Sequence, residues 1–385
     1  MFRTMNGVLV VSDEQSEPQT LSDVLRLCLQ QLRDQLPEGW SLVPVAEAAG
    51  GGDRRVDAVL SVSGPDGATA SLVLEAKSVL ERRDVLAVSE QLRGAAGRFP
   101  NAWSVVVARY LAPSVREALM EQGVSYIDAT GNMRLAVSTP GLFIANRGVD
   151  NDPWRGPGRP RGTLKGVPAA KVVRALVDYT GPWSIRELID RSGASTGATY
   201  RVVEYLERED LVTRDEDGKI VLRDWRRLLQ QWSKDYGFVR SSRITRYIEP
   251  RGLATLLTKA SDVAGVRYAV TGTTAAAEWA PYAPARSAMV YVAEAAKAAA
   301  AWGLRPAESG ANVLLAEPAT DVVFERTITT IDGTVIVAPA QVAVDLMTGP
   351  GRNPAEAEEL MDWMERNESS WRLRQPSRAG ALSPA

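Results

Sequence analysis

Two carboxylates and a lysine are the residues of this chain whose types and spacing could support hydrolytic chemistry. Asp57 lies in the run Arg-Arg-Val-Asp-Ala-Val-Leu, while Glu75 and Lys77 lie in the run Leu-Val-Leu-Glu-Ala-Lys. The intervening Gly-Pro-Asp-Gly67 is typical of a hairpin turn in which Gly67 adopts the left-handed conformation. The turn predicts a register that places Asp57 opposite Glu75, with Lys77 on the same face of the sheet.

Such a cluster could hold one or two Mg²⁺ ions and activate a water for attack on a phosphodiester. Carboxylate oxygens are ligands that Mg²⁺ takes in proteins, so Asp57 and Glu75 are the candidate metal ligands. Lys77 would stabilise charge on the transferring phosphate. A structural alternative stays open, because Glu-x-Lys on a strand also forms solvated cross-strand ion pairs and Asp57 could be an exposed edge charge.

The composition excludes other common hydrolytic sites. The chain has 385 residues and no histidine, so Ser/His/Asp and Cys/His nucleophile systems lack their base. Its single cysteine, Cys28, cannot form an intrachain disulfide, which favours a reducing cytoplasm. The alanine-rich stretch 293–301 is interrupted by Glu294 and Lys297 and is too short to span a bilayer. We therefore expect a cytoplasmic protein without membrane segments.

The elements that would position the carboxylates follow from hydrophobic periodicity and from turn residues. Before residue 150 the pattern alternates between helical stripes and short apolar strands, which predicts a mixed α/β domain over residues 1–149. Its expected helices cover 20–35, 84–96 and 113–122, and its expected strands cover 41–45, 56–62, 71–76, 104–108, 124–127, 133–137 and 142–145.

This order of elements, with Asp57 on the second strand and Glu75 and Lys77 on the third, resembles the restriction-endonuclease-like fold and its PD-(D/E)xK motif. The resemblance covers about residues 20–145. It implies that Asp57 and Glu75 bind metal and that Lys77 acts on the water or the phosphate. Gln91 matches a polar position on the helix that follows, so it joins the candidate catalytic residues.

The net charge of −2 is unevenly distributed along the chain. Residues 151–246 carry 19 Lys/Arg and 13 Asp/Glu, a local charge of +6, which leaves −8 for the rest. A basic segment at 150–166 is so rich in Pro and Gly that it predicts a linker. The other expected divisions are a winged helix-turn-helix at 167–224, a connecting helix at 225–246, a C-terminal domain at 247–370 and a disordered tail at 371–385.

The segment 167–224 has the pattern of a winged helix-turn-helix. An apolar helical stripe is followed by Ser184 and Glu187, which form a capping box at the next helix. A tight turn at 192–194 precedes a helix that starts at Thr196. A hairpin with the turn Asp-Glu-Asp-Gly at 215–218 completes the motif.

The second helix of such a pair presents its N-terminal turn to the DNA major groove. On the wing, Arg214 and Lys219 would reach the backbone or the minor groove. Many winged helices mediate protein contacts instead, and the acidic residues between 207 and 217 are unfavourable near DNA, so that alternative stays open. The residues expected to face bases and phosphates are Ser195, Thr196, Thr199, Tyr200 and Arg201.

The linker sequence Pro-Gly-Arg-Pro-Arg-Gly resembles an AT-hook core. The resemblance implies that Arg159 and Arg161 enter the narrow minor groove of A·T-rich DNA, where the negative potential is deepest. Beside a winged helix, we expect this segment to act as an auxiliary contact to double-stranded DNA.

The C-terminal region contains a strand, a glycine turn and a helix start around Gly272. This arrangement resembles the Gly-Thr-Ala turn of nucleotidyltransferase-like folds, which implies an α+β domain. Active members carry an Asp-x-Asp metal pair on the next strand, but 289–292 reads Met-Val-Tyr-Val and has no carboxylate. We therefore expect no nucleotidyl transfer.

Several segments of this region, including 269–272, 311–315, 337–346 and 350–352, resemble the C-terminal domain of AbiEi-type antitoxins of type IV toxin–antitoxin systems. In that family a winged helix-turn-helix precedes such a domain and the protein represses its own operon. Segments 111–114 and 123–132 are similar to those of long regulators of this group that carry a nuclease-like N-terminus. Gln341 and Asp345, four residues apart, are expected only to cap and pair at a helix surface.

The sequence thus predicts an α/β multidomain protein that is a sequence-specific DNA-binding regulator, an antitoxin-like repressor with a role in phage defence. Its expected partners are double-stranded DNA, a cognate toxin and a second copy in a homodimer. The alternative is a Mg²⁺-dependent PD-(D/E)xK endonuclease that the winged helix targets to DNA. A third reading is an adaptor whose C-terminal domain binds a toxin or a nucleotide.

Overall fold

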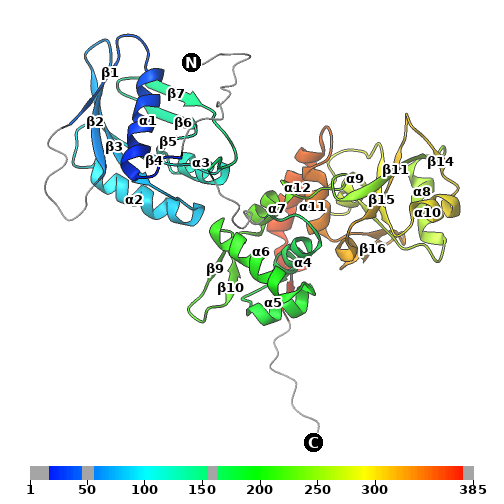
Figure 1. The fold of residues 1–385 in the computed structure, drawn as a ribbon. Helices are drawn as coiled ribbons and strands as arrows, with labels where there is room; N and C mark the ends of the chain where they lie inside the picture. The colour runs from blue at the N-terminus through cyan, green and yellow to red at the C-terminus, as the bar shows by residue number, and fades with distance from the viewer. Residues whose placement is uncertain (1–16, 46–55, 155–162, 376–385) are drawn as a thin grey trace, which may run out of the picture. The chain divides into compact units, whose positions relative to one another are not determined.

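The computed structural model describes residues 17–45, 56–154 and 163–375, and these form two compact units. The first contains residues 17–45 and 56–154, and the second contains 163–207 and 211–375. Figure 1 shows a helix-flanked sheet in the first unit and a mixture of helical and sheet regions in the second. Within the described ranges, no helix is long and apolar enough to cross a bilayer.

The first unit is built on a seven-stranded sheet whose strands follow one another in chain order from β1 to β7. β3 to β5 run parallel, and the remaining neighbours pair antiparallel. Parallel neighbours need crossover connections, which α2 and α3 supply. The strands are β1 (Ser41–Pro44), β2 (Ala58–Ser63), β3 (Thr69–Lys77), β4 (Ala102–Ala108), β5 (Ser125–Asp128), β6 (Met133–Val137) and β7 (Leu142–Asn146).

Helices cover both faces of this sheet (Figure 1). α1 (Leu21–Gln35) packs on one face, while α2 (Val85–Ala96) and α3 (Pro113–Glu121) pack on the other. Strand side chains alternate between faces, so Leu74 packs toward α1 whereas Glu75 faces α2. A short 3-10 helix, η2 (Arg82–Asp84), precedes α2. The expected mixed α/β architecture is confirmed, and the restriction-endonuclease-like assignment stays a prediction.

The hairpin register predicted from the Pro-Asp-Gly turn is confirmed. Ala58 pairs with Leu74 and Ser63 with Thr69. Just before the paired segment, the Asp57 N–H donates to the carbonyl of Leu74 at 3.1 Å. Gly67 has a φ of +78°, the left-handed conformation that glycine adopts without steric cost. Helices and strands of this unit begin and end within about two residues of the expected positions.

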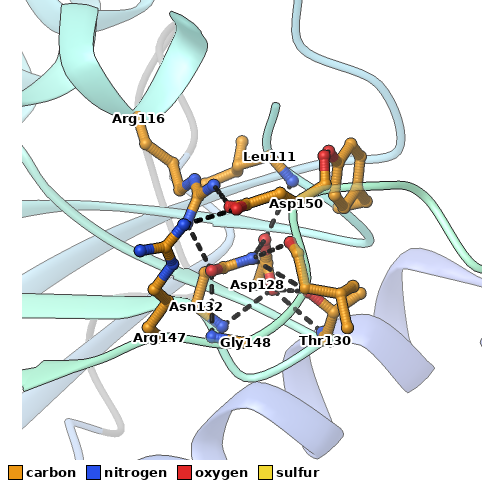
Figure 2. A network of polar contacts seen from close by, with 10 residues as sticks. Leu111, Arg116, Asp128, Thr130, Asn132, Arg147, Gly148 and Asp150 are labelled. Carbon is orange, nitrogen blue, oxygen red and sulfur yellow. Dashed lines mark hydrogen bonds and ion pairs between the residues drawn. The ribbon is translucent and has the colours of Figure 1, made fainter. Parts of the chain in front are cut away.

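A buried carboxylate organises the turn between β5 and β6 (Figure 2). Asp128 accepts the backbone N–H groups of Leu111 at 2.9 Å, Thr130 at 2.9 Å and Asn132 at 3.1 Å. It also accepts the Thr130 hydroxyl at 2.6 Å and the Asn132 amide at 2.9 Å, while Arg116 donates to Asn132. Burial raises the pKa of Asp128, and the bonds from Thr130 and Asn132 oppose that shift. The network holds neighbouring loops of this unit in place.

The second unit begins with the expected winged helix-turn-helix. Ser184 and Glu187 form the predicted capping box, and Gly193 ends α5 in the left-handed conformation. The wing strands β9 and β10 pair antiparallel, and the bridge from Trp183 to Ile220 attaches them to the helices. The elements are α4 (Val167–Asp178), β8 (Tyr179–Thr180), α5 (Ile185–Ser192), α6 (Thr196–Arg208), β9 (Val212–Arg214), β10 (Ile220–Leu222) and α7 (Trp225–Ser233).

The rest of the second unit is an α+β domain around a seven-stranded mixed sheet of order β14-β11-β15-β13-β12-β17-β16. Its elements are β11 (Ser242–Ile248), α8 (Leu253–Asp262), β12 (Tyr268–Thr271), α9 (Gly272–Ala276), β13 (Ala288–Val292), α10 (Ala295–Trp302), β14 (Arg305–Pro306), β15 (Val313–Pro318), η3 (Asp321–Phe324), β16 (Ile328–Thr329), β17 (Val335–Ile336), α11 (Pro339–Met347), α12 (Asn353–Arg366), α13 (Glu368–Trp371) and β18 (Leu373–Arg374).

One apolar core joins the winged helix to this C-terminal domain, and it runs from Leu164 to Trp371. The expected start of a disordered tail at residue 371 is wrong for residues 371–375. Trp371 is 3% exposed, and β18 pairs in parallel with β8 of the winged helix. The prediction failed because the segment is stabilised by partners almost two hundred residues away, which its composition does not reveal.

Candidate nucleic-acid interface and carboxylate cluster

The structure brings Glu75, Lys77 and Gln91 together in the first unit. Glu75 is 6% exposed, and its Oε1 accepts the Lys77 ammonium at 2.7 Å and the Gln91 amide at 3.1 Å. Glu75 and Lys77 come from the end of β3, and Gln91 comes from α2. These contacts are those of a structural ion pair, yet Glu75 Oε2 is buried and has no hydrogen-bond partner. A buried polar atom without a partner is rare, and a water, an ion or a catalytic role can account for it.

Asp57 lies beside this cluster but has a different environment. It is exposed, and its Oδ2 accepts the backbone N–H of Ala76 at 2.7 Å. Nowhere in the described ranges do three or more His, Cys, Asp or Glu side chains gather so that they could share a metal ion. Two carboxylates nevertheless fit Mg²⁺, because this ion keeps several waters and needs only one or two protein carboxylates. Asp57 and Glu75 would hold it, and the ion would polarise a phosphate or a water.

The first turns of α6 form the exposed face expected to meet DNA. Ser195, Thr196 and Arg201 are exposed, and Tyr200 is 51% exposed. Thr199 corrects the prediction, because its side chain is fully buried and its hydroxyl donates to the carbonyl of Ser195 at 3.1 Å. Thr199 therefore stabilises the start of the helix. The other four residues form a surface without acidic side chains, while Glu204 follows one turn later.

The two cationic side chains of the wing are either paired within the protein or half-buried. Arg214 forms an ion pair with Glu207 at 2.7 Å and donates to the carbonyl of Gly218 at 2.9 Å, so its charge is offset within the motif. Lys219 is half-buried. The tip between them is acidic, with Glu216 and Asp217 exposed. The wing is thus a weaker candidate for DNA contact than α6.

The linker arginines Arg159 and Arg161 lie outside the described residues. Their entry into a minor groove remains a prediction from the Pro-Gly-Arg-Pro-Arg-Gly sequence.

The threonines that flank Gly272 in the turn of the C-terminal domain donate their hydroxyls to carboxylates elsewhere in the domain. Gly272 has a φ of +67°, and a Cβ atom there would approach Met289 Sδ to 2.7 Å. Thr271 donates to Asp345 at 2.7 Å, and Thr273 donates to Glu356 at 2.5 Å. The turn therefore holds the core of this domain together.

Gln341 and Asp345 are not surface residues, contrary to the expectation from their spacing. Both are fully buried, and the Gln341 amide donates to Asp345 at 3.0 Å. Tyr291 donates to Asp345 at 2.8 Å, and Tyr236 accepts from Gln341 at 3.0 Å. Burial raises the pKa of Asp345 to about 7, and the bonds from Thr271, Tyr291 and Gln341 oppose the shift.

A second buried pair was missed by the sequence reasoning. Arg174 and Asp178 of α4 are fully buried and bond to each other at 2.7 Å, and Arg174 also donates to Gln341 at 3.0 Å. The signal was present, because both charged residues lie among the apolar residues of α4. Charges inside an apolar stripe are almost never left unpaired.

Comparisons with known protein families agree with this division of the second unit. Residues 169–216 match the IclR helix-turn-helix domain, and residues 219–364 match the family described as transcriptional regulator, AbiEi antitoxin, type IV TA system. No match to the chain is found among curated proteins. The resemblance to AbiEi-type antitoxins expected from the sequence is confirmed for residues 219–364, and the helix-turn-helix expected before that domain is confirmed for residues 169–216.

Proposed function

We propose that the protein is a sequence-specific repressor that binds DNA upstream of its own gene through α6. The observation that carries the proposal is the exposed N-terminal surface of α6, where Tyr200 and Arg201 project from a helix-turn-helix. Arginine reads guanine through paired hydrogen bonds, and tyrosine contacts phosphates or base edges. Because the acidic wing is unfavourable near phosphates, we expect most of the sequence specificity to come from α6.

Replacement of Arg201 by alanine in the full chain tests this proposal. We expect binding to the upstream DNA to weaken by about 1–3 kcal/mol, the usual cost of a lost base contact. Arg305→Ala is the matched control, since Arg305 is an exposed arginine on β14 of the antitoxin domain. Gel shifts on the upstream region would measure both variants, and equal weakening by the two would contradict the proposal.

The linker arginines contribute an auxiliary contact in the same proposal. Double substitution of Arg159 and Arg161 should weaken binding to A·T-flanked sites more than to G·C-flanked sites, because the guanine amino group obstructs the minor groove. Equal weakening at both kinds of site would leave only nonspecific attraction.

The antitoxin match supports a proposal for the biological setting. We place the protein in the cytoplasm as the regulator of an operon that also encodes a toxin, with a role in phage defence, and as a homodimer on a palindromic operator. The motivation is the AbiEi-type domain at 219–364. Light scattering of the complex with the operator gives the stoichiometry, and one chain bound per site would argue against the dimer.

A second candidate activity belongs to the first unit, and the unpaired Glu75 Oε2 favours it. In this proposal Asp57 and Glu75 bind Mg²⁺, Lys77 stabilises charge on the phosphate and Gln91 orients Glu75. Purified protein should bind Mn²⁺ or Mg²⁺, and Asp57→Asn should abolish binding by removing an anionic ligand. Metal-dependent DNA nicking that disappears in Lys77→Ala would establish a nuclease, whereas wild-type protein that binds neither ion would exclude the metal site.

A further inference from the structure

The end of α4 is capped by residues of the antitoxin domain and of the C-terminal segment. The last carbonyls of a helix have no partner inside the helix. Here Arg372 donates to the carbonyls of Val177 at 2.8 Å and Leu176 at 3.3 Å, and Arg326 donates to the carbonyl of Asp178 at 2.8 Å. Arg372 lies beyond both family matches, which end at residues 216 and 364.

The side of α4 is held by a second contact with the same domain. Arg174 is fully buried and donates to Gln341 Oε1 at 3.0 Å and to the carbonyls of Val322 and Glu325 at 3.2 Å each. With Asp178, these acceptors account for the guanidinium. A buried arginine is stable only when it is fully paired, so the antitoxin domain is needed to keep Arg174 in place.

Gln341 connects this arginine to Asp345. Its Oε1 faces the Arg174 donor, and its Nε2 donates to Asp345 Oδ1 and to the Tyr236 hydroxyl, each at 3.0 Å. Tyr291 donates to Asp345 and contacts the Tyr236 hydroxyl at 3.2 Å. The amide can satisfy both sides in only one orientation, because reversing it would place its NH₂ group against a guanidinium.

α4 in turn packs against α6, the recognition helix that is proposed to read DNA. Lys171 donates to the carbonyl of Gly193, in the turn before α6, at 3.4 Å. Apolar residues of both helices, such as Leu176 and Val203, belong to one core. A displacement of α4 would therefore move or loosen the exposed turn that holds Tyr200.

We infer that Gln341 and Arg372 are positioning residues for DNA recognition: acting through α4, they fix the recognition helix from the antitoxin domain and the C-terminal segment. The inference rests on the proposed DNA binding by α6. It predicts that changes in these buried contacts weaken DNA binding even in molecules that remain folded.

An exchange of polar groups tests the role of Gln341. Gln341→Glu removes the Nε2 donor to Asp345 and places two carboxyl groups against each other, so it breaks the chain of hydrogen bonds. It should raise the Kd for the upstream DNA roughly 2- to 30-fold. Asp345→Asn keeps a carbonyl oxygen that can accept from Gln341, so alone it should change the Kd less. The double variant offers a carboxylate to Arg174 and an amide to that carboxylate, and its Kd should return to within about twofold of wild type.

Glu249→Gln is the matched control, because Glu249 is a buried carboxylate of the same unit that is paired with Lys259. It should leave the Kd unchanged. All variants are compared at a temperature where circular dichroism shows them folded. Unchanged DNA affinity in Gln341→Glu, or a double variant that binds DNA no better than Gln341→Glu, would overturn the role of Gln341. If the wild-type protein does not bind the upstream DNA, or if Arg201→Ala binds it with unchanged affinity, the proposed function itself would be contradicted.

Arg372 is tested by hydrogen exchange and DNA binding together. In Arg372→Ala the amides at the end of α4 should exchange about tenfold faster, the equivalent of one lost hydrogen bond, while those of α8 stay unchanged. The Kd for DNA should rise in the same variant, and Arg372→Lys should recover part of the affinity because lysine still donates to a carbonyl. Faster exchange without weaker DNA binding would show that Arg372 has only a structural role.

Discussion

Each unit of the protein buries a carboxylate, but the partners of Asp128 and Asp345 come from different distances along the chain. Asp128 bonds only to residues between 111 and 132. Asp345 bonds to Thr271 and Tyr291 and is linked through Gln341 to α4. The same chemistry therefore stabilises a local group of loops in the first unit, whereas in the second it joins a DNA-binding motif to its neighbouring domain.

The largest expected effect comes from breaking the buried pair in α4. Asp178→Ala leaves Arg174 without its carboxylate, and removal of one partner of a buried ion pair costs about 3–5 kcal/mol of unfolding free energy. Urea denaturation would measure the loss. Glu358→Ala is the control, since Glu358 is an exposed partner of Arg226 and should cost less than about 1 kcal/mol. Similar losses in both variants would remove the distinction between buried and exposed pairs.

The next largest effect is the pH dependence of the stability of the second unit. Burial holds the pKa of Asp345 at about 7, above the ordinary value near 3.8 that applies to the unfolded chain. The folded state therefore binds a proton that the unfolded state has released, and stability falls as the pH rises toward 7 and then levels off. Between pH 5 and 8 the loss is about 2–3 kcal/mol.

Thermal unfolding of wild type and Asp345→Asn over that range measures this dependence. Asparagine cannot titrate, so the variant should show a flatter profile. A wild-type profile that parallels the variant would place the pKa of Asp345 close to its ordinary value and contradict the expectation.

A smaller and more local effect is expected for Asp128. Asp128→Asn keeps the shape of the side chain but places an NH₂ group against N–H donors, at a cost of about 1–3 kcal/mol. Hydrogen exchange followed by mass spectrometry should show faster exchange in β5 and β6 of the first unit and no change in α4 or α11. Faster exchange in both units would contradict the local character of the Asp128 network.

Local signals in the sequence predicted most of the elements. The Ser184 cap, the Gly67 turn and the alternating strands depend on residues that are close in the chain, and each is present. The hairpin register was also local, so the pairing of Ala58 with Leu74 followed from the turn alone.

The predictions that failed depended on packing between distant segments. Thr199 was expected to face DNA, but α6 packs against the core on that side. Gln341 and Asp345 have the spacing of a surface pair, but α11 is enclosed by α4, α7, α9 and α12. In the same way, the segment 371–375 is ordered by Arg372 and by pairing with β8. Spacing along one helix cannot show which neighbours cover it.

The smallest stability effect is expected at Glu75, and it separates the candidate metal cluster from both buried networks. Glu75→Gln keeps a carbonyl that can accept from Lys77 or Gln91, and Lys77 reaches solvent with 31% of its side chain exposed. Because no fully buried charge loses its partner, the free energy of unfolding should change by less than about 1 kcal/mol.

The same variant should nevertheless lose Mn²⁺ binding, which isothermal titration calorimetry measures, since the amide cannot supply an anionic oxygen. A side chain that matters little for stability but is required for binding marks a functional cluster. A loss of several kcal/mol in Glu75→Gln, together with no metal binding by wild type, would instead assign Glu75 the same structural role as Asp128.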